Sequence, residues 1–271
     1  MQVVNFEYNN ELLSDYNLIV CNFDGSSGFN TIDIGNKVVI NKVKAPKSNK
    51  YKSIGYKYEE AFTMDFQVGK IDCDTGNNII SEEEINSIVR WLNRKIYAKL
   101  KIIYDDGSYS NIYYNGIFNV ELIKLGDDAV GLNLTFESDS PFAYMEEISY
   151  TGELSNLKKL TIHDISDETG YIYANTKIEC LESGNYFIDN DFDYNRIIIN
   201  NCSAGEIITL DGENKIISTN LPSHSSLPND FNYNFLRVVN NYNNVGNIYS
   251  SNLKCKITII YSPIRKVGAT L

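Results

Sequence analysis

The sequence contains few histidines, cysteines and tryptophans. It has only two histidines and one tryptophan, and its five cysteines have no CxxC spacing (Cys21, Cys73, Cys180, Cys202, Cys255). This cysteine pattern excludes a zinc ribbon and a dense disulfide framework. It predicts buried free thiols in a protein made in a reducing cytoplasm. No GxGxxG, Walker or GxSxG pattern occurs, so the chain has no recognisable nucleotide-binding loop or nucleophile elbow.

Positive charge is also scarce. Lys and Arg number 24 against 35 Asp and Glu, which gives a net charge of −11. Sequence-specific binding of nucleic acid is therefore not expected, because phosphate contacts need clustered cations. One stretch, residues 42–57 (KVKAPKSNKYKSIGYK), has the opposite sign. It fits a solvated loop, and the alternative is a docking surface for an acidic partner.

Long apolar runs are absent as well. No run approaches the ~20 residues of a membrane span, and the N-terminus has no basic-plus-apolar signal pattern, so no membrane partner is expected. The hydrophobic fraction of 43% is still sufficient for folded cores. Twenty Tyr and twelve Phe, with many Ile and Asn, favour a β-rich chain with many loops.

One helix is well specified, over about residues 81–93. Ser81 is a good N-cap, and Glu84 three residues later completes a capping box. Apolar residues then recur at i, i+3, i+4 and i+7, which places them on one buried face (Ile85, Ile88, Val89, Leu92). A single amphipathic helix without a catalytic motif beside it indicates an assembly component rather than an enzyme.

Strands surround this helix. Residues 61–68 alternate with Phe62, Met64, Phe66 and Val68 on one face. Residues 37–44 also alternate, with Val38, Ile40 and Val43 expected to point inward. After the helix, turn signals at Asp106-Gly107, Asn115-Gly116 and 126–128 predict a four-strand meander that ends at residues 131–137.

The second half of the chain reads as strands only. About eight short strands follow at 8–12 residue spacing, separated by turns rich in Gly, Asn, Asp and Ser, which is typical of a β-sandwich. The pattern breaks at residues 138–147, which contain Pro141 and a charged pair. We therefore predict two domains, residues 1–148 with the helix and residues 149–271 with the sandwich.

Several groups of residues resemble chemical sites without matching their full patterns. Residues 72–83 resemble an EF-hand loop in the spacing of their acidic residues. Asn77 replaces the required Gly, however, so a helix-entry turn is the better interpretation. Asp189, Asp191 and Asp193 have ligand spacing, yet Tyr194 stands where the Gly belongs. His163 and His224 lie in no known motif. Core packing explains most of the tyrosine-rich strand segments (Tyr104, Tyr109, Tyr113, Tyr114, Tyr171, Tyr173, Tyr186, Phe187). We predict no catalytic, cofactor-binding or metal-binding residue, and no enzyme activity.

The order and spacing of several segments resemble distal tail proteins of tailed phages, in particular those that infect Gram-positive bacteria. In the first domain the matching segments are FEYNNELLSDYNLIVCNFDG, WLNRKIYAKLKI and GLNLTFESDSPFAY. In the second they are GEIITLDGENKII, DFNYNFLRVVNNYNN and KCKITIIYSPIRKV. These are packing patterns rather than catalytic signatures, and together they cover most of the chain.

The resemblance implies a structural virion protein. Its fold would be mainly β, with an N-terminal β-sheet or split-barrel domain bearing one α-helix and a C-terminal galectin-like β-sandwich. Six copies would form a homohexameric ring at the virion tail tip or baseplate, assembled in the cytoplasm of the bacterial host. The ring would join the tail tube protein to the tail-associated hub protein, with the tape-measure protein as a further partner, and would surround the DNA-ejection channel. An acidic channel wall would repel DNA phosphates.

Two other functions remain open. A carbohydrate-binding module would adsorb to the host cell wall through the C-terminal β-sandwich, and requires an exposed aromatic platform with neighbouring Asp or Asn groups. Some family members carry an inserted carbohydrate-binding module, for which this chain has no room. A cell-wall hydrolase would require two opposed carboxylates or a zinc site in a cleft.

Overall fold

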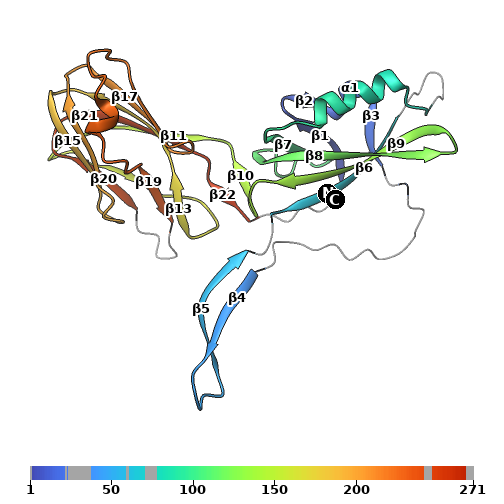
Figure 1. Ribbon diagram of the computed structural model, residues 1–271, viewed down its shortest axis with the longest axis horizontal. Coiled ribbons are helices and arrows are strands. Elements are labelled where there is room, and N and C mark those ends of the chain that lie inside the picture. Colours follow the sequence, from blue (N-terminus) through green and yellow to red (C-terminus); the bar gives the residue numbers. More distant parts are fainter. Residues whose placement is uncertain are drawn as a thin grey trace. The chain divides into compact units, whose positions relative to one another are not determined.

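The computed structural model describes residues 2–21, 23, 38–58, 61–70, 78–240 and 246–266 (Figure 1). The chain folds into two compact units, the first comprising Met1–Tyr144 with Lys266–Leu271 and the second Met145–Arg265. Each unit has its own hydrophobic core. No helix in the described part of the chain is long and apolar enough to cross a membrane.

The first unit is built on a twisted antiparallel sheet in the order β2-β1-β7-β8-β9-β6-β3. A 3-10 helix, Leu13–Tyr16, links β2 to β3, and a further strand, β10 (Ala143–Met145), pairs with β8. The strands of the sheet are β1 (Val3–Tyr8), β2 (Glu11–Leu12), β3 (Leu18–Cys21), β6 (Thr63–Lys70), β7 (Ala98–Tyr104), β8 (Ile112–Leu125) and β9 (Asp128–Ser138).

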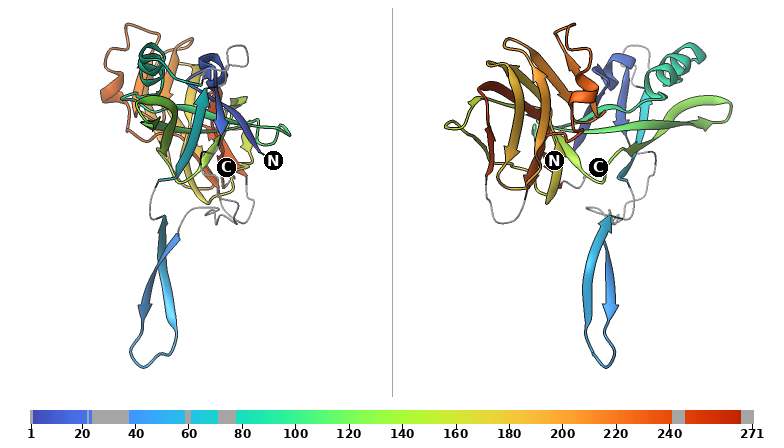
Figure 2. Two further views of the ribbon diagram at one scale, coloured as in Figure 1. Left: turned by 90° about the vertical axis from the view of Figure 1, so that its right-hand side faces the viewer. Right: turned by 60° about the vertical axis from the view of Figure 1, so that its left-hand side comes forward.

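Helix α1 (Glu82–Leu92) lies over one face of this sheet, as Figure 2 also shows. The Ser81 side chain accepts a hydrogen bond from the Glu84 backbone N–H, and the Glu84 carboxylate accepts one from the Ser81 N–H at 2.8 Å. Lys70 contacts the same carboxylate at 2.7 Å, and with the Ser81 N–H it lowers the Glu84 pKa. The capping box and helix are therefore confirmed. The sheet packs against the apolar face, whose buried residues are Ile88, Trp91 and Leu92.

The turn predicted at Asn115-Gly116 is wrong. Strand β8 runs straight through it, and Gly116 pairs with both Ala98 of β7 and Ser138 of β9. A Cβ atom on Gly116 would lie 2.3 Å from the Glu137 carbonyl oxygen and 2.4 Å from the Phe136 ring. The glycine therefore permits close packing inside a sheet rather than a chain reversal. The meander has three strands, β7, β8 and β9, instead of four.

Residues 42–57 form a hairpin rather than the predicted solvated loop. Strands β4 (Val38–Lys44) and β5 (Tyr51–Tyr58) pair with each other in a two-stranded sheet. The inward orientation predicted for Val38, Ile40 and Val43 is also wrong, because each is 48–49% exposed. Alternation along a strand identifies its two faces, but it does not show that either face meets a core within the same chain.

The second unit is a β-sandwich, as predicted. One sheet has the order β11-β21-β14-β17-β18 and the other β12-β20-β15-β16, and side chains from both fill one core. The first sheet contains β11 (Ile148–Leu154), β14 (Asn175–Cys180), β17 (Ile207–Asp211), β18 (Ile216–Thr219) and β21 (Cys255–Tyr261). The second contains β12 (Leu160–Ile162), β15 (Gly184–Asn190), β16 (Ile197–Cys202) and β20 (Asn247–Ser251).

Smaller elements complete this unit. Strands β13 (Gly170–Tyr173) and β19 (Arg237–Asn240) pair with each other, and β22 (Ile264–Arg265) ends the unit. A four-residue helix, α2 (Leu227–Asp230), was not predicted. Cys180, Cys202 and Cys255 are buried free thiols as expected, whereas the free thiol of Cys21 is half-buried. Cys73 lies outside the described residues.

Candidate functional site

The acidic groups considered as metal sites do not form one in the described chain. Each of three aspartates contacts a cation instead: Asp189 contacts Arg196 at 2.7 Å, Asp191 contacts Lys159 at 2.7 Å, and Asp193 contacts Arg237 at 2.8 Å. Among the described residues no group of three or more His, Cys, Asp or Glu side chains is arranged to hold a metal ion. The first half of the EF-hand-like loop, residues 72–77, lies outside those residues.

The two histidines have different environments. His163 is exposed, whereas His224 is buried between two carboxylates. Its Nδ1 lies 2.7 Å from Glu206 Oε1 and its Nε2 lies 3.3 Å from Asp230 Oδ2. The Ser226 hydroxyl donates to Asp230 at 2.6 Å rather than to the imidazole. Both ring nitrogens therefore contact carboxylates, an arrangement that fixes the loop at residues 221–230 and leaves no nitrogen to activate a hydroxyl.

Burial and hydrogen bonding act in opposite directions on Glu206. Burial favours the neutral acid, but the Ser203 backbone N–H, the Thr219 hydroxyl and His224 all contact its carboxylate, and together they lower its pKa. The contacts are 2.7–3.0 Å long, as expected for hydrogen bonds to an ionised acceptor. The Glu206 carboxylate therefore links Ser203, Thr219 and His224 within the second unit.

The tyrosine-rich strand segments divide into core and surface. Tyr104, Tyr113, Tyr114 and Tyr186 are buried, as core packing predicts. Tyr109, Tyr171 and Tyr173 are 42–59% exposed, and Phe187 is half-buried. The exposed pair on β13, Tyr171 and Tyr173, therefore needs a different explanation from the buried rings.

The first surface of functional interest is the β4–β5 hairpin. Six large apolar side chains on it are 48–67% exposed, and we call them together the hairpin surface (Val38, Ile40, Val43, Tyr51, Ile54, Tyr56). At the base of the hairpin, Tyr58 packs edge-on against Phe142 with the ring centroids 4.7 Å apart. A two-stranded hairpin has little stability alone, and apolar patches exposed in this way mark contact surfaces.

The hairpin also concentrates positive charge. Residues 38–58 contain six lysines and no Asp or Glu, in a chain whose net charge is −11 (Lys42, Lys44, Lys47, Lys50, Lys52, Lys57). None of these ammonium groups lies within 4.0 Å of a carboxylate among the described residues. Lys44 instead sits over the Tyr51 ring, 5.7 Å from its centroid. The hairpin is therefore both apolar and cationic. The remaining residues together carry a net charge more negative than the −11 of the full chain.

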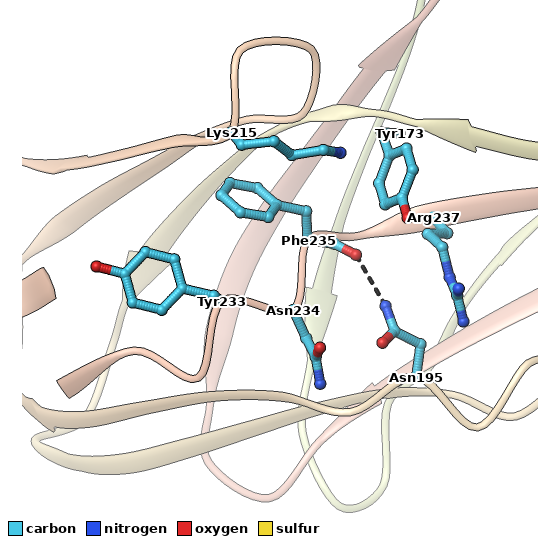
Figure 3. A pocket seen from close by; sticks show the side chains of 7 residues that line it. All are labelled: Tyr173, Asn195, Lys215, Tyr233, Asn234, Phe235 and Arg237. Carbon is cyan, nitrogen blue, oxygen red and sulfur yellow. Dashed lines mark hydrogen bonds between the residues drawn. The ribbon is translucent and has the colours of Figure 1, made fainter. Parts of the chain in front are cut away.

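The second surface is a hollow of about 250 Å³ on the β-sandwich, which we call the aromatic–cation groove (Figure 3). Its lining comes from β13, the loop after β15, the β17–β18 turn and the segment leading into β19 (Tyr173, Asn195, Lys215, Tyr233, Asn234, Phe235, Arg237). The sequence did not reveal this groove, because its residues come from four separate segments. Only the exposed tyrosine alternation of β13 and the Asn-Tyr-Asn run before Phe235 hint at it.

Comparisons with known proteins give two kinds of match. A family model described as a phage tail protein N-terminal domain matches residues 1–140, and one described as a phage tail C-terminal domain matches residues 142–261. A search of curated proteins finds no match. Among solved structures, the chain resembles the crystal structure of SPP1 Dit (gp 19.1), described as a paradigm of the hub adsorption apparatus in phages infecting Gram-positive bacteria.

That structural likeness extends over the entire fold. The TM-score is 0.62 at 12% sequence identity, and the match covers 96% of this chain and 99% of the other. The predicted fold class is thereby confirmed: a mainly β chain, with one long helix on an N-terminal sheet, followed by a galectin-like β-sandwich.

Proposed function

This chain belongs to the phage tail protein family described by those two domain models, and from that premise we propose that it forms a six-membered ring at the tail tip. In this proposal the first unit builds the ring, and the ring surrounds the channel through which DNA is ejected. The chain acts as a structural part of the virion and catalyses no reaction. Resemblance to distal tail proteins supports the number six and the position at the tip.

The β4–β5 hairpin is the observation that carries the self-association. Its apolar side chains and lysines are exposed in the isolated chain, and the aromatic side chain of Tyr58 packs against Phe142 at its base. A neighbouring copy supplies carboxylates for the lysines of the hairpin, because the rest of this chain is strongly acidic. The hairpin of one copy against a different surface of the next is a heterologous contact, and repeated heterologous contacts close into rings.

The other partners follow from the position of the ring. The tail tube protein would stack on one face, the tail-associated hub protein on the other, and the tape-measure protein would end near the channel. DNA passes without sequence-specific contact, and acidic groups on the channel wall would keep its phosphates from adhering. Mainly Lys and Arg along the channel of an assembled ring would contradict this last point.

Mass photometry of the full chain tests the proposal. The expected species is six times the 30.8 kDa protomer, and negative-stain images should show rings with a central hole. Assembly is measured first with the chain alone and then with the hub protein added. A protomer that remains monomeric under both conditions would overturn the ring, as would a ring of a different copy number.

A further inference from the structure

We propose that the aromatic–cation groove of the second unit binds an acidic saccharide, that is, a sugar ring carrying a phosphate or carboxylate. This inference does not depend on ring formation, since every residue of the groove belongs to one β-sandwich. Four features of the groove support it: a cation without a direct carboxylate contact, unused polar atoms, exposed aromatic rings and a preformed backbone.

The cation is Lys215. Its Nζ lies 2.9 Å from the centroid of the Tyr173 ring and 5.1 Å from that of Phe235, and Figure 3 shows the ammonium directed toward Tyr173. Within the described chain no carboxylate oxygen comes within 4.0 Å of it. Arg237 differs, because Asp193 holds its Nε at 2.8 Å. Asp211 interacts with Lys215 only from beyond 4.0 Å. The Lys215 ammonium group therefore has no direct carboxylate contact, and a ligand anion would provide one.

Two carboxamides line the groove, and each donates an intramolecular hydrogen bond through its Nδ2 atom. Asn195 Nδ2 donates to the Phe235 carbonyl at 2.8 Å, and Asn234 Nδ2 donates to the Arg196 carbonyl at 2.9 Å. These bonds fix the two amide planes, and both Oδ1 atoms are left without an intramolecular partner in the described chain. The Tyr173 and Tyr233 hydroxyls are likewise uncommitted there. Sugar hydroxyls, which both donate and accept, suit such a mixed set of groups.

Two tyrosine rings supply apolar surface beside these polar groups. Tyr233 is 58% exposed and Tyr173 is 45% exposed, so both rings offer apolar surface to a ligand. The hollow of about 250 Å³ lies below the ~300–1,000 Å³ of typical ligand pockets, so it suits one ring of a longer glycan chain rather than a whole cofactor.

The groove is held in shape by uncommon backbone conformations. Tyr233 has φ +56° and Lys215 has φ +59°, in the left-handed region that costs a non-glycine residue energy. The Asp211 carboxylate fixes the turn of Lys215 by accepting hydrogen bonds from the Glu213 and Asn214 N–H groups at 3.0 and 2.8 Å. Such positions concentrate at binding sites, where the surrounding structure maintains them.

The test measures binding of small probes to the full chain by saturation-transfer NMR and calorimetry. The probes are glucose 6-phosphate, N-acetylglucosamine 1-phosphate and glucuronic acid, compared with glucose, inorganic phosphate and AMP. At least one acidic sugar is expected to bind, and at least about tenfold more tightly than glucose or inorganic phosphate, because charge and ring contacts act together. Binding should weaken as salt is added.

Matched variants locate the binding. Lys215→Met keeps the alkyl chain and removes the charge. It should weaken binding of the acidic sugar about tenfold or more. Lys177→Met, at an exposed lysine of β14 outside the groove, should change nothing. Tyr233→Asn keeps a residue that tolerates positive φ and removes the ring, so binding should weaken several-fold. Tyr194→Asn is its control, because Tyr194 is 90% exposed with φ +54° and does not line the groove.

Each contrary result overturns the proposal. Absence of binding by all three acidic sugars would exclude the site. Equal binding of inorganic phosphate would reduce it to an anion site, and equal binding of glucose would remove the requirement for charge. Binding of AMP more tightly than the acidic sugars would indicate that the tyrosine rings of the groove stack on a nucleobase. Losses of the same size in Lys177→Met and Lys215→Met would place binding elsewhere. None of these outcomes affects ring formation, which is measured separately by mass.

Discussion

The indole Nε1 of Trp91 donates a hydrogen bond of 2.9 Å to the backbone carbonyl of Tyr8. This bond joins α1 to β1 across 83 positions of the chain, within the buried core of the first unit. The indole also stacks on Tyr16 at a centroid distance of 4.4 Å and on Phe6 at 5.8 Å. The single tryptophan therefore fixes the helix to the N-terminal segment through both a polar contact and aromatic packing.

Trp91→Phe should destabilise the first unit by about 1–3 kcal/mol, because the Tyr8 carbonyl is left buried without its donor. Hydrogen–deuterium exchange of peptides from β1 and α1 measures the change without interference from the second unit. Tyr97→Phe, at a side chain that is 59% exposed, is the control and should shift protection by less than ~0.5 kcal/mol. Equal protection in both variants would show that the indole bond contributes nothing.

Leu92→Asp should prevent folding of the first unit. Leu92 is fully buried on the apolar face of α1, so the substitution would place an unpaired carboxylate in the core. Soluble expression and far-UV circular dichroism report the loss. Ile96→Asp, four residues further on at a side chain that is 72% exposed, should still fold. A soluble Leu92→Asp protein that still forms rings would show that this face is not core.

Local signals in the sequence were sufficient to predict α1. The Ser81–Glu84 capping box and the apolar spacing up to Leu92 depend only on residues within a few positions of each other. The turn predicted at Asn115-Gly116 is wrong because the local turn signal is overridden by contacts with residues distant in the sequence. The Phe136 ring and the Glu137 carbonyl lie over Gly116, and the sequence does not show that β9 brings them there.

Gly116→Ala tests that explanation. The new methyl group would lie 2.3 Å from the Glu137 carbonyl oxygen, so β8 and β9 must separate, and we expect a loss of about 1–3 kcal/mol in unfolding free energy. Asn115→Ala is the matched control, because its half-buried side chain makes no hydrogen bond within the described chain. Urea unfolding should separate the two variants. Comparable losses would instead indicate that the dipeptide matters as a unit, as a turn would require.

The candidate surfaces were harder to predict than the strands. The lysines at 42–57 suggested a surface for an acidic partner, but the hairpin that presents them became evident only from the register of β4 with β5. The aromatic–cation groove depends on the β17–β18 turn lying beside the segment before β19, and on left-handed backbone at Lys215 and Tyr233. Neither long-range proximity nor a strained φ at a non-glycine residue has a local sequence signature.

Stability of the second unit should fall in acid, partly through Glu206. Its folded-state pKa is lowered, so its contribution is present above the unfolded pKa of about 4.3 and is lost as pH falls through the folded value. Glu206→Gln should cost about 1.5–3 kcal/mol near pH 7 and give a flatter stability curve between about pH 5 and 3. Urea midpoints across that range measure both effects. Thr219→Val removes one donor and should give an intermediate slope, whereas an unchanged slope in Glu206→Gln would assign the acid sensitivity to other groups.

Ring assembly should depend on the charge and the apolar side chains of the β4–β5 hairpin. Lys52→Glu reverses one exposed charge in every copy, so a six-membered ring would carry the change at each of its interfaces. The protein concentration needed for half-assembly should rise about tenfold or more, because like charges then face each other at the contact. Ile54→Asp, at a side chain that is 67% exposed, should have a similar effect by placing a charge in an apolar contact.

Two controls separate this from a general effect of charge. Lys177→Glu and Ile216→Asp make the same changes at exposed positions of the second unit, and both should assemble as the unmodified chain does. Mass photometry across a dilution series measures all four variants, and circular dichroism verifies that each is folded. Adding salt should weaken assembly of the unmodified chain more than that of Lys52→Glu, since the attraction being screened is already lost in the variant. Unimpaired rings from both hairpin variants would place the subunit contact on another surface, because an interface that depends on this hairpin cannot accept both a reversed charge and a carboxylate in its apolar part.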